Sequence, residues 1–319
     1  MTSLSFYALA YMQKGLAASL LVGSACSVAG VFIIVRQIVF VSLVLAQLAV
    51  LGFSAAIFLD LSEMSRIFTA FGFTLIGVLY MALFQLKNKT PADATLGMCF
   101  IFCHAVSLLL LAKSTQGLEE IRHLTSGNLL SVTWEEIMAL GAAWIFLMII
   151  HFAGHRSFVF ICADDEFARI SGVNVKKWEI LFYISLGLII SVALQAVGTF
   201  YVFSCLVFPA MSGLLIARKL FAIQIISFIS AAAASIIGLS FSYIYDFPSS
   251  ESIILWQIII YLLIALSIKI KQIILRFRIA RYYYKTLTRR FAALRTRRLN
   301  LKPDSNLISN ANSNPKQTR

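Results

Sequence analysis

Three residues with metal-ligand chemistry lie within one apolar stretch of the sequence. Cys99 and Cys103 are four residues apart, so a helix places both thiols on one face, with His104 beside the second thiol. Thiolate and imidazole groups suit a soft or borderline transition metal. The competing interpretation is that both cysteines are small apolar residues that fill space between helices. The spacing is compatible with a metal site and equally with simple packing.

The densest group of acidic side chains is Asp164, Asp165 and Glu166, and the nearest histidine is His155. Clustered carboxylates can act as general acids and bases, so this group is where a membrane-embedded enzyme, such as a lipid-modifying transferase, would have its active site. Helix capping explains the same residues with fewer assumptions. Asp164 can cap a helix, and the two acidic residues after it favour the positive N-terminal end of that helix.

A short amphipathic helix is predicted at this cap, over about residues 164–175. Phe167 and Ile170 fall on one face at i, i+3 spacing. Gly172 suits a left-handed stop after the helix. A helix of this kind can lie on a lipid surface or dock into a partner protein, and the physical argument alone leaves both interpretations open.

The elements that carry these residues are predicted to be transmembrane helices. Of the 319 residues, 60% are hydrophobic and 13% are charged, whereas soluble domains have about 45–50% and about 25%. A helix needs about 20 apolar residues to cross a bilayer. Eight stretches contain no charged residue: 15–35, 38–59, 67–86, 94–112, 137–150, 180–217, 220–245 and 252–267. Because 180–217 has room for two crossings, we predict an all-α polytopic membrane protein with about nine transmembrane helices, with eight as the alternative.

The placement of Lys and Arg predicts the orientation. Basic and acidic breaks alternate between the apolar stretches, and the basic breaks are predicted to be cytoplasmic. The N-terminus then lies outside and the C-terminus inside. Residues 1–268 form the predicted transmembrane domain. Residues 269–319 form a basic cytoplasmic tail, helical at first and disordered after Lys302.

The tail carries 14 Lys and Arg residues against a single acidic residue, Asp304. Because it directly follows the last predicted crossing, we interpret it as an anchor on anionic lipid headgroups rather than as a nucleic-acid-binding segment. His151 and His155 lie at the cytoplasmic edge of an earlier crossing. A solvated or headgroup-contacting role is expected for both.

One crossing is predicted to contain broken backbone. Gln195 and Gly198 interrupt apolar sequence, and Pro209 follows within the same stretch. Irregular backbone at membrane depth is tolerated only where protein or a cavity lines it. These residues are therefore candidates for lining a translocation path.

The sequence contains no P-loop motif of the type Gly-x-x-x-x-Gly-Lys-Ser/Thr. Ion-driven carriers commonly place titratable groups inside the membrane, and here His104 is the only clearly intramembrane one. A transporter of this kind would need an energy source on another chain. A channel or a structural protein would show the same pattern.

The ordered motifs of the chain resemble those of the ABC-3 family, the membrane permeases of zinc-, manganese- and iron-type ABC importers. The similarity extends over about residues 15–266 and is carried by Val35-Arg36-Gln37, Thr95-Leu96-Gly97, Ser126-Gly-Asn-Leu-Leu-Ser-Val132, Asp165-Glu-Phe-Ala-Arg169 with Gly172, Ala193-Leu-Gln-Ala-Val-Gly198, Leu206-Val-Phe-Pro-Ala210 and Ser240-Phe-Ser-Tyr243 with Asp246-Phe-Pro-Ser249.

This resemblance implies a type II importer-like permease in the cytoplasmic (inner) membrane. It implies a second permease in a homo- or heterodimer, a cytoplasmic ATPase that binds the ATP, and an external solute-binding protein. The chain itself would be no enzyme and would bind no cofactor. Its segment 164–175 would be the coupling helix that enters a cleft of the ATPase, with contacts from Asp164, Asp165, Glu166, Phe167, Ala168, Arg169 and Gly172.

The chain departs from the family pattern in the second crossing. Members of the family carry an Asp and a His at i, i+4 spacing there, a pair suited to a divalent cation. The corresponding residues here are Leu43 and Gln47. Three explanations are open: the partner of a heterodimer holds the ligands, other ligands such as Cys99, Cys103 and His104 replace them, or the substrate is not a metal. Gln47 is still expected to face the path, because an amide facing lipid is costly.

Overall fold

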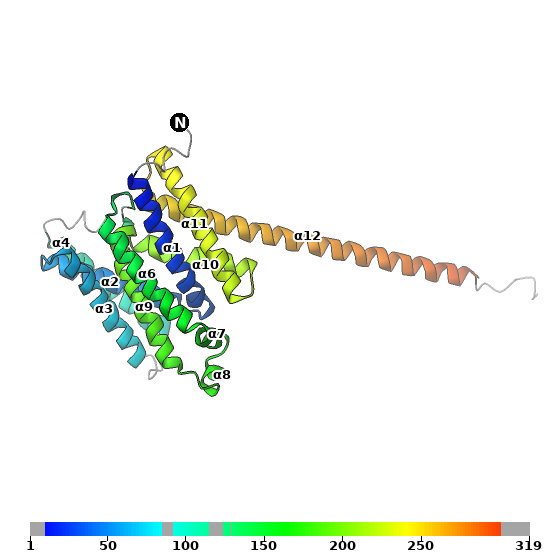
Figure 1. Cartoon of the computed structure of the whole chain (residues 1–319). Helices are drawn as coiled ribbons and strands as arrows, with labels where there is room; N and C mark the ends of the chain where they lie inside the picture. The colour runs from blue at the N-terminus through cyan, green and yellow to red at the C-terminus, as the bar shows by residue number, and fades with distance from the viewer. Residues whose placement is uncertain (1–9, 85–91, 115–123, 128, 301–319) are drawn as a thin grey trace, which may run out of the picture. The chain divides into compact units, whose positions relative to one another are not determined.

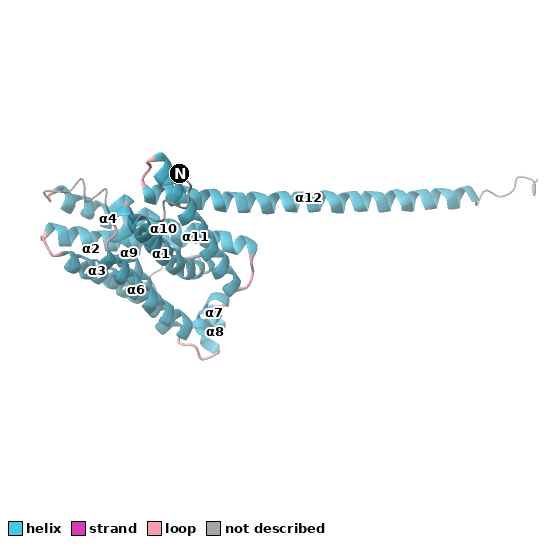
Figure 2. Cartoon of the chain, turned by 45° about the horizontal axis from the view of Figure 1, so that its top comes forward, coloured by secondary structure: helices cyan, strands magenta, loops and turns pink. Residues whose placement is uncertain are grey.

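The computed structural model describes residues 10–84, 92–114, 124–127 and 129–300. Within these residues the regular structure is helical and contains no strand (Figure 2). The helices are α1 (Ala10–Val35), α2 (Val39–Phe58), α3 (Glu63–Phe84), α4 (Ala92–Ala112), α6 (Trp134–Ala153), α7 (His155–Ala163), α8 (Asp165–Ile170), α9 (Val175–Val197), α10 (Thr199–Ile216), α11 (Leu220–Tyr245) and α12 (Ser249–Asn300), with one 3₁₀ turn, η2 (Leu129–Ser131).

Eight helices of the described chain are long and apolar enough to cross a membrane: α1, α2, α4, α6, α9, α10, α11 and the Ser249–Ile274 part of α12. Helix α3 is also 22 residues long, and its sequence is uncharged from position 67 to its end. The eight helices agree with the alternative count of the sequence analysis, and α3 lies where the remaining predicted crossing is expected. The apolar stretch 180–217 is divided at Gly198 between α9 and α10, as expected.

The chain divides into two compact units, Met1–Ala265 and Leu266–Arg319. The second unit contains the end of α12, which runs through the basic segment to Asn300. The disorder predicted after Lys302 concerns residues outside the described part of the chain. The site residues all belong to the first unit.

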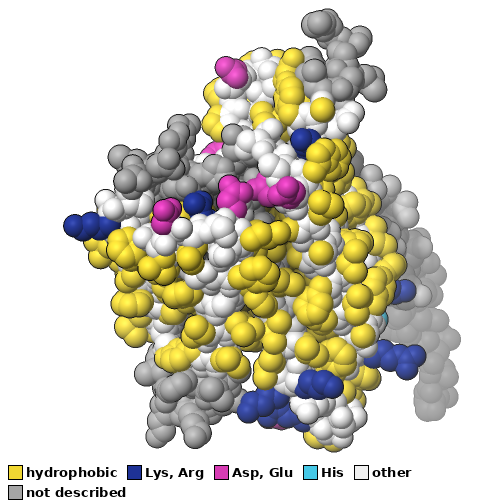
Figure 3. All heavy atoms as spheres, turned by 60° about the vertical axis from the view of Figure 1, so that its left-hand side comes forward, with side chains coloured by type: hydrophobic (Ala, Val, Ile, Leu, Met, Phe, Trp, Pro, Cys, Tyr) yellow, Lys and Arg dark blue, Asp and Glu magenta, His cyan; other side chains and the backbone are white. Residues whose placement is uncertain are grey.

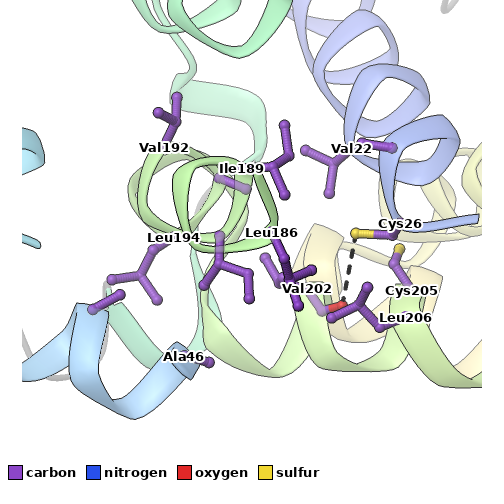
Figure 4. Packing of buried hydrophobic residues seen from close by; sticks show 14 of the residues in the cluster. Val22, Cys26, Ala46, Leu186, Ile189, Val192, Leu194, Val202, Cys205 and Leu206 are labelled. Carbon is purple, nitrogen blue, oxygen red and sulfur yellow. Dashed lines mark hydrogen bonds between the residues drawn. The ribbon is translucent and has the colours of Figure 1, made fainter. Parts of the chain in front are cut away.

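Helix α1 lies at the centre of the first unit, where it packs against α6, α10 and α11 (Figure 1). Helix α2 packs against α3 and α4, and α9 joins the two groups through contacts with α2, α3 and α6. The interior is filled by aliphatic side chains such as Leu186, Ile189 and Val22 from these helices (Figure 4). The central helices are therefore held by dispersion and close packing.

Small residues allow the closest helix contacts. Ser230, Ala234 and Gly238 form a buried ridge at i, i+4 spacing on α11. A methyl group at Gly238 would lie 2.6 Å from the Cα atom of Ile253 on α12. The ridge therefore brings the two backbones together, which is how small residues stabilise helix pairs in membranes.

Local capping fixes where α6 begins. The Thr133 hydroxyl accepts a hydrogen bond from the Glu136 N–H at 3.3 Å, and the Glu136 carboxylate accepts one from the Thr133 N–H at 2.8 Å. This reciprocal pair satisfies two backbone donors that the helix would otherwise leave free. It places the start of the crossing at Trp134.

Charged side chains lie at the two ends of an apolar band on the face shown in Figure 3. Acidic side chains gather near one end, with a few basic ones beside them, and a group of Lys and Arg lies at the opposite end. An ion pair joins the end of α1 to the start of α9, where Arg36 Nη2 lies 2.6 Å from Glu179 Oε1. This arrangement matches a helical bundle whose middle faces lipid.

Candidate functional site

Helix α8 begins at the predicted cap. Asp164 has extended backbone geometry, and its Oδ1 accepts hydrogen bonds from the Glu166 N–H at 2.8 Å and the Phe167 N–H at 3.2 Å. These are two of the backbone donors that the start of a helix leaves unsatisfied. Asp165 is the first residue of the helix. The capping interpretation of the Asp164 carboxylate is confirmed.

The helix is shorter than the predicted segment 164–175, which is a correction to the sequence analysis. It contains six residues and ends at Ile170. Gly172 has φ of +80°, and the Val173 N–H donates to the Ala168 carbonyl at 3.0 Å. Because the chain reverses at this glycine, it cannot continue the helix. Helix α9 then starts at Val175, which is the last residue of the predicted helical segment 164–175.

One face of α8 anchors it and the other is free. Ala168 is fully buried against Ile161 and Val175. Phe167 and Ile170 are 54% and 85% exposed, and the ring of Phe167 lies 6.1 Å from that of Phe160 on α7. Glu166 and Arg169 are also exposed. Helices α7 and α8 therefore present an apolar surface with charged neighbours at one end of the bundle (Figure 1).

Two glutamines in adjoining helices carry buried and unpaired carbonyl oxygens. Gln47 on α2 is 7% exposed, and Gln195 on α9 is partly buried. In the described part of the chain, neither Oε1 atom has a hydrogen-bond partner. A buried acceptor left unpaired costs about 1–3 kcal/mol. Leu43, one turn before Gln47, is partly buried. That Gln47 and Gln195 face a translocation path stays a prediction.

The predicted backbone break occurs at Gly198, between α9 and α10. Gly198 has φ of +81° and lies against Gly127, whose φ is +67°. A methyl group at Gly198 would approach the Gly127 backbone nitrogen to 2.5 Å. The Thr199 hydroxyl donates to the Leu124 carbonyl at 2.9 Å, and that of Ser250 to the Val197 carbonyl at 3.2 Å. Protein therefore lines the break on the side of Gly127.

Pro209 does not interrupt its helix. It is buried inside α10, which continues from Thr199 to Ile216. A proline in a helix removes one backbone donor, so the carbonyl of Cys205 loses its usual helical partner. The expected break is thus confined to Gly198.

The candidate metal ligands are only partly brought together. Cys99 and Cys103 lie one turn apart on α4, partly buried and buried respectively, whereas His104 is exposed and stacks on Phe100 with ring centroids 6.2 Å apart. No group of three or more His, Cys, Asp or Glu side chains suited to a metal ion occurs among the described residues. The two thiols lie near each other, but the imidazole of His104 does not join them in a three-ligand metal site.

The sequence analysis predicts a solvated or headgroup-contacting role for His151. This prediction is wrong, because the side chain is buried. It is 6% exposed, and its ring lies 5.2 Å from Phe32 and 5.1 Å from Phe158. The sequence spacing could not reveal that α1 and α7 bring aromatic rings to this end of α6. His155, by contrast, is exposed as predicted.

A buried polar cluster on α10 and α12 was missed from the sequence. The Ser204 hydroxyl donates to Gln257 Oε1, and Gln257 Nε2 donates to Cys205 Sγ at 2.9 Å. Beside this cluster, the Cys26 thiol of α1 donates to the Val202 carbonyl of α10 at 4.0 Å (Figure 4). The signal that could have indicated this cluster was Gln257, a single amide within apolar sequence.

Comparison with known proteins identifies the family. The model of the ABC 3 transport family matches residues 8–268. The manganese transport system membrane protein MntC of Halalkalibacterium halodurans is 24% identical over 260 residues, covering 80% of this chain and 88% of that protein. The manganese import system permease protein ScaB of Streptococcus parasanguinis is 24% identical over 256 residues, covering 79% and 89%.

A solved structure has the same fold. The structure of PsaBC from Streptococcus pneumoniae in complex with Fab superposes with a TM-score of 0.72 at 21% identity, covering 80% of this chain and 91% of that chain. The eight described helices that are long and apolar enough to cross a membrane are thus part of a known architecture. With a family match that extends over most of its length, this chain is a multi-pass membrane protein that belongs to the ABC 3 transport family.

Proposed function

We propose that the chain is the permease subunit of an ABC importer for a divalent transition metal, with manganese as the first candidate and zinc or iron as alternatives. A separate cytoplasmic ATPase binds and hydrolyses the ATP. Family membership and the names of the manganese relatives support this proposal. The proposed coupling role is supported by helix α8. Ala168 anchors this helix to the bundle, and Phe167 and Ile170 remain exposed and can contact a partner.

In this proposal the membrane is the cytoplasmic (inner) membrane, and the C-terminus is cytoplasmic. The basic end of the bundle carries α8 and faces the ATPase. A second permease, identical or different, completes the path, and an external solute-binding protein delivers the metal. The positive-inside distribution of Lys and Arg supports this orientation.

The substrate ligands are the part of the family pattern that this chain lacks, because Leu43 and Gln47 occupy the positions of the Asp and His. A heterodimer in which the partner supplies the charged ligands accounts for this departure. A permease for a non-metal substrate is the alternative. A membrane enzyme is disfavoured, because the Asp164 carboxylate already caps α8 through two hydrogen bonds.

Metal accumulation in cells tests the substrate class. Cells with and without this chain are grown in limiting manganese, zinc or iron, and total cell metal is measured by elemental analysis. We expect one of these metals to fall when the chain is removed and to recover when it is restored. Unchanged levels of all three metals would contradict the metal substrate and favour the non-metal alternative.

A further inference from the structure

An open groove lies on the surface of the bundle, and the described residues that line it do not belong to α2, α8 or the Gly198 break. Its volume is about 760 Å³. Ser24 and Val28 of α1 form its floor. Helices α6 and α11 both pack on α1 and supply the walls, which include Trp144, Phe221 and Ile225. Pockets for small molecules typically have roughly 300–1,000 Å³, so the groove can hold a ligand of that size.

The lining of the groove is mainly apolar, and its basic side chains lie close together in the sequence. The apolar part includes Met148, Phe152 and Phe228, and the polar part consists chiefly of His151, His155, Arg156 and Gln224. Among the described residues, no acidic one borders the groove. His155 and Arg156 are exposed. A ligand with an apolar body and a negative head complements this distribution.

The basic side chains His155 and Arg156 lie where two crossings end. Helix α6 ends at Ala153, immediately before His155 and Arg156, and α11 begins at Leu220. This position is the level at which lipid phosphates meet basic side chains. The apolar lining then extends along α6 and α11 toward the bilayer interior, where acyl chains lie.

Two polar atoms in residues of the groove wall lack a partner. The Nδ1–H of His151 donates to the Leu147 carbonyl at 3.0 Å. Its Nε2 and the Nε1–H of Trp144 have no hydrogen-bond partner among the described residues. His151 is more than nine-tenths buried. Because both atoms are buried, they lie beneath the groove surface rather than at positions that a ligand would contact.

We propose that this groove binds one anionic phospholipid, with its phosphate on Arg156 and His155 and an acyl chain between α6 and α11. The occupant is a lipid rather than a second copy of this chain because the groove combines a cationic end at the membrane boundary with an apolar body. The site depends on membrane insertion alone. It does not depend on which substrate the chain transports.

Native mass spectrometry of the purified full chain tests this site. The protein is mixed with equal amounts of phosphatidylglycerol and phosphatidylcholine of the same acyl composition, and the retained lipid is measured. We expect phosphatidylglycerol to be retained preferentially. Arg156→Gln should reduce its retention about fivefold, the effect of roughly one basic side chain near a membrane surface.

Matched variants locate the lipid. Arg218→Gln removes an exposed charge between α10 and α11 that does not border the groove, and it should leave retention unchanged. Ile225→Trp adds volume inside the groove and should displace the lipid. Ile229→Trp, one turn further along α11 and outside the groove, should not.

Three results would overturn the proposal. Equal retention of the two lipids would remove the anionic preference, and equal loss in Arg156→Gln and Arg218→Gln would make the effect nonspecific. The third is a cysteine at position 225 that forms a symmetric disulfide between two chains in native membranes. That result would show that a second copy covers the groove.

Discussion

At the scale of single residues, the resemblance to the family predicts a departure at Gln47, which we place on the proposed substrate path. The resemblance assigns this position to a His, and an amide carbonyl is by contrast a weak and uncharged ligand. The Gln47 Oε1 is buried without a partner in the described chain. An unpaired buried acceptor lowers the stability of the fold, so we expect the Gln47 amide to serve function rather than stability.

Replacing Gln47 with Leu should separate these two roles. Gln47→Leu removes an unpaired buried acceptor, so the thermal stability of the purified protein should not fall, while substrate uptake should fall at least severalfold. The matched control is Gln257→Leu, which breaks two hydrogen bonds and leaves Ser204 unpaired. The control should lose about 1–3 kcal/mol of stability. If Gln47→Leu is the less stable variant and uptake is normal, the amide is structural.

The glycine break permits a second test at this scale. Gly198→Ala forces φ of +81° on a residue with a Cβ atom and brings that atom within 2.5 Å of the Gly127 backbone. We expect a loss of at least about 2 kcal/mol in stability. Gly141→Ala is the control, because a methyl group at Gly141 in α6 meets no atom within 4 Å, and alanine favours a helix by up to about 1 kcal/mol. Equal thermal stability of the two variants would contradict the close approach.

At the scale of elements, helices were predictable and their exact partners were not. Runs of uncharged residues indicate crossings, and Asp164 indicates a helix start, because both depend on local chemistry. The predicted helix over 164–175 was too long because Gly172 turns the chain back and lets α9 begin at Val175. Gln257 was missed because its partners on α10 are far away in sequence.

Helix α8 carries the prediction that belongs to this scale. Phe167→Asp places a charge on the exposed apolar face, so it should reduce ATPase association and substrate uptake by at least tenfold without affecting membrane insertion. Phe167→Leu should retain most of both. Ser171→Asp introduces the same charge at the exposed C-terminal end of α8 and should be nearly neutral. Co-purification and uptake measure these effects. Normal association of Phe167→Asp with the ATPase would mean that α8 lies on lipid.

At the scale of the whole molecule, the fold explains why several short motifs far apart in the sequence belong together. Arg36, which follows α1, pairs with Glu179 in α9, and Gly127 packs against Gly198. The sequence shows these residues as separate pieces, and only the packed bundle brings them into contact. The metal ligands are not predictable in this way, because one permease forms only part of the proposed path.

The central claim is that this chain is a permease driven by an ATPase on another chain. Proteoliposomes containing this chain, with and without its ATPase partner, are loaded with ATP on the ATPase side and supplied with manganese and the solute-binding protein on the other. We predict that the chain alone neither hydrolyses ATP nor moves manganese, and that the complex accumulates manganese only with ATP. ATP hydrolysis by the chain alone, or equal manganese flux without ATP, would contradict the account.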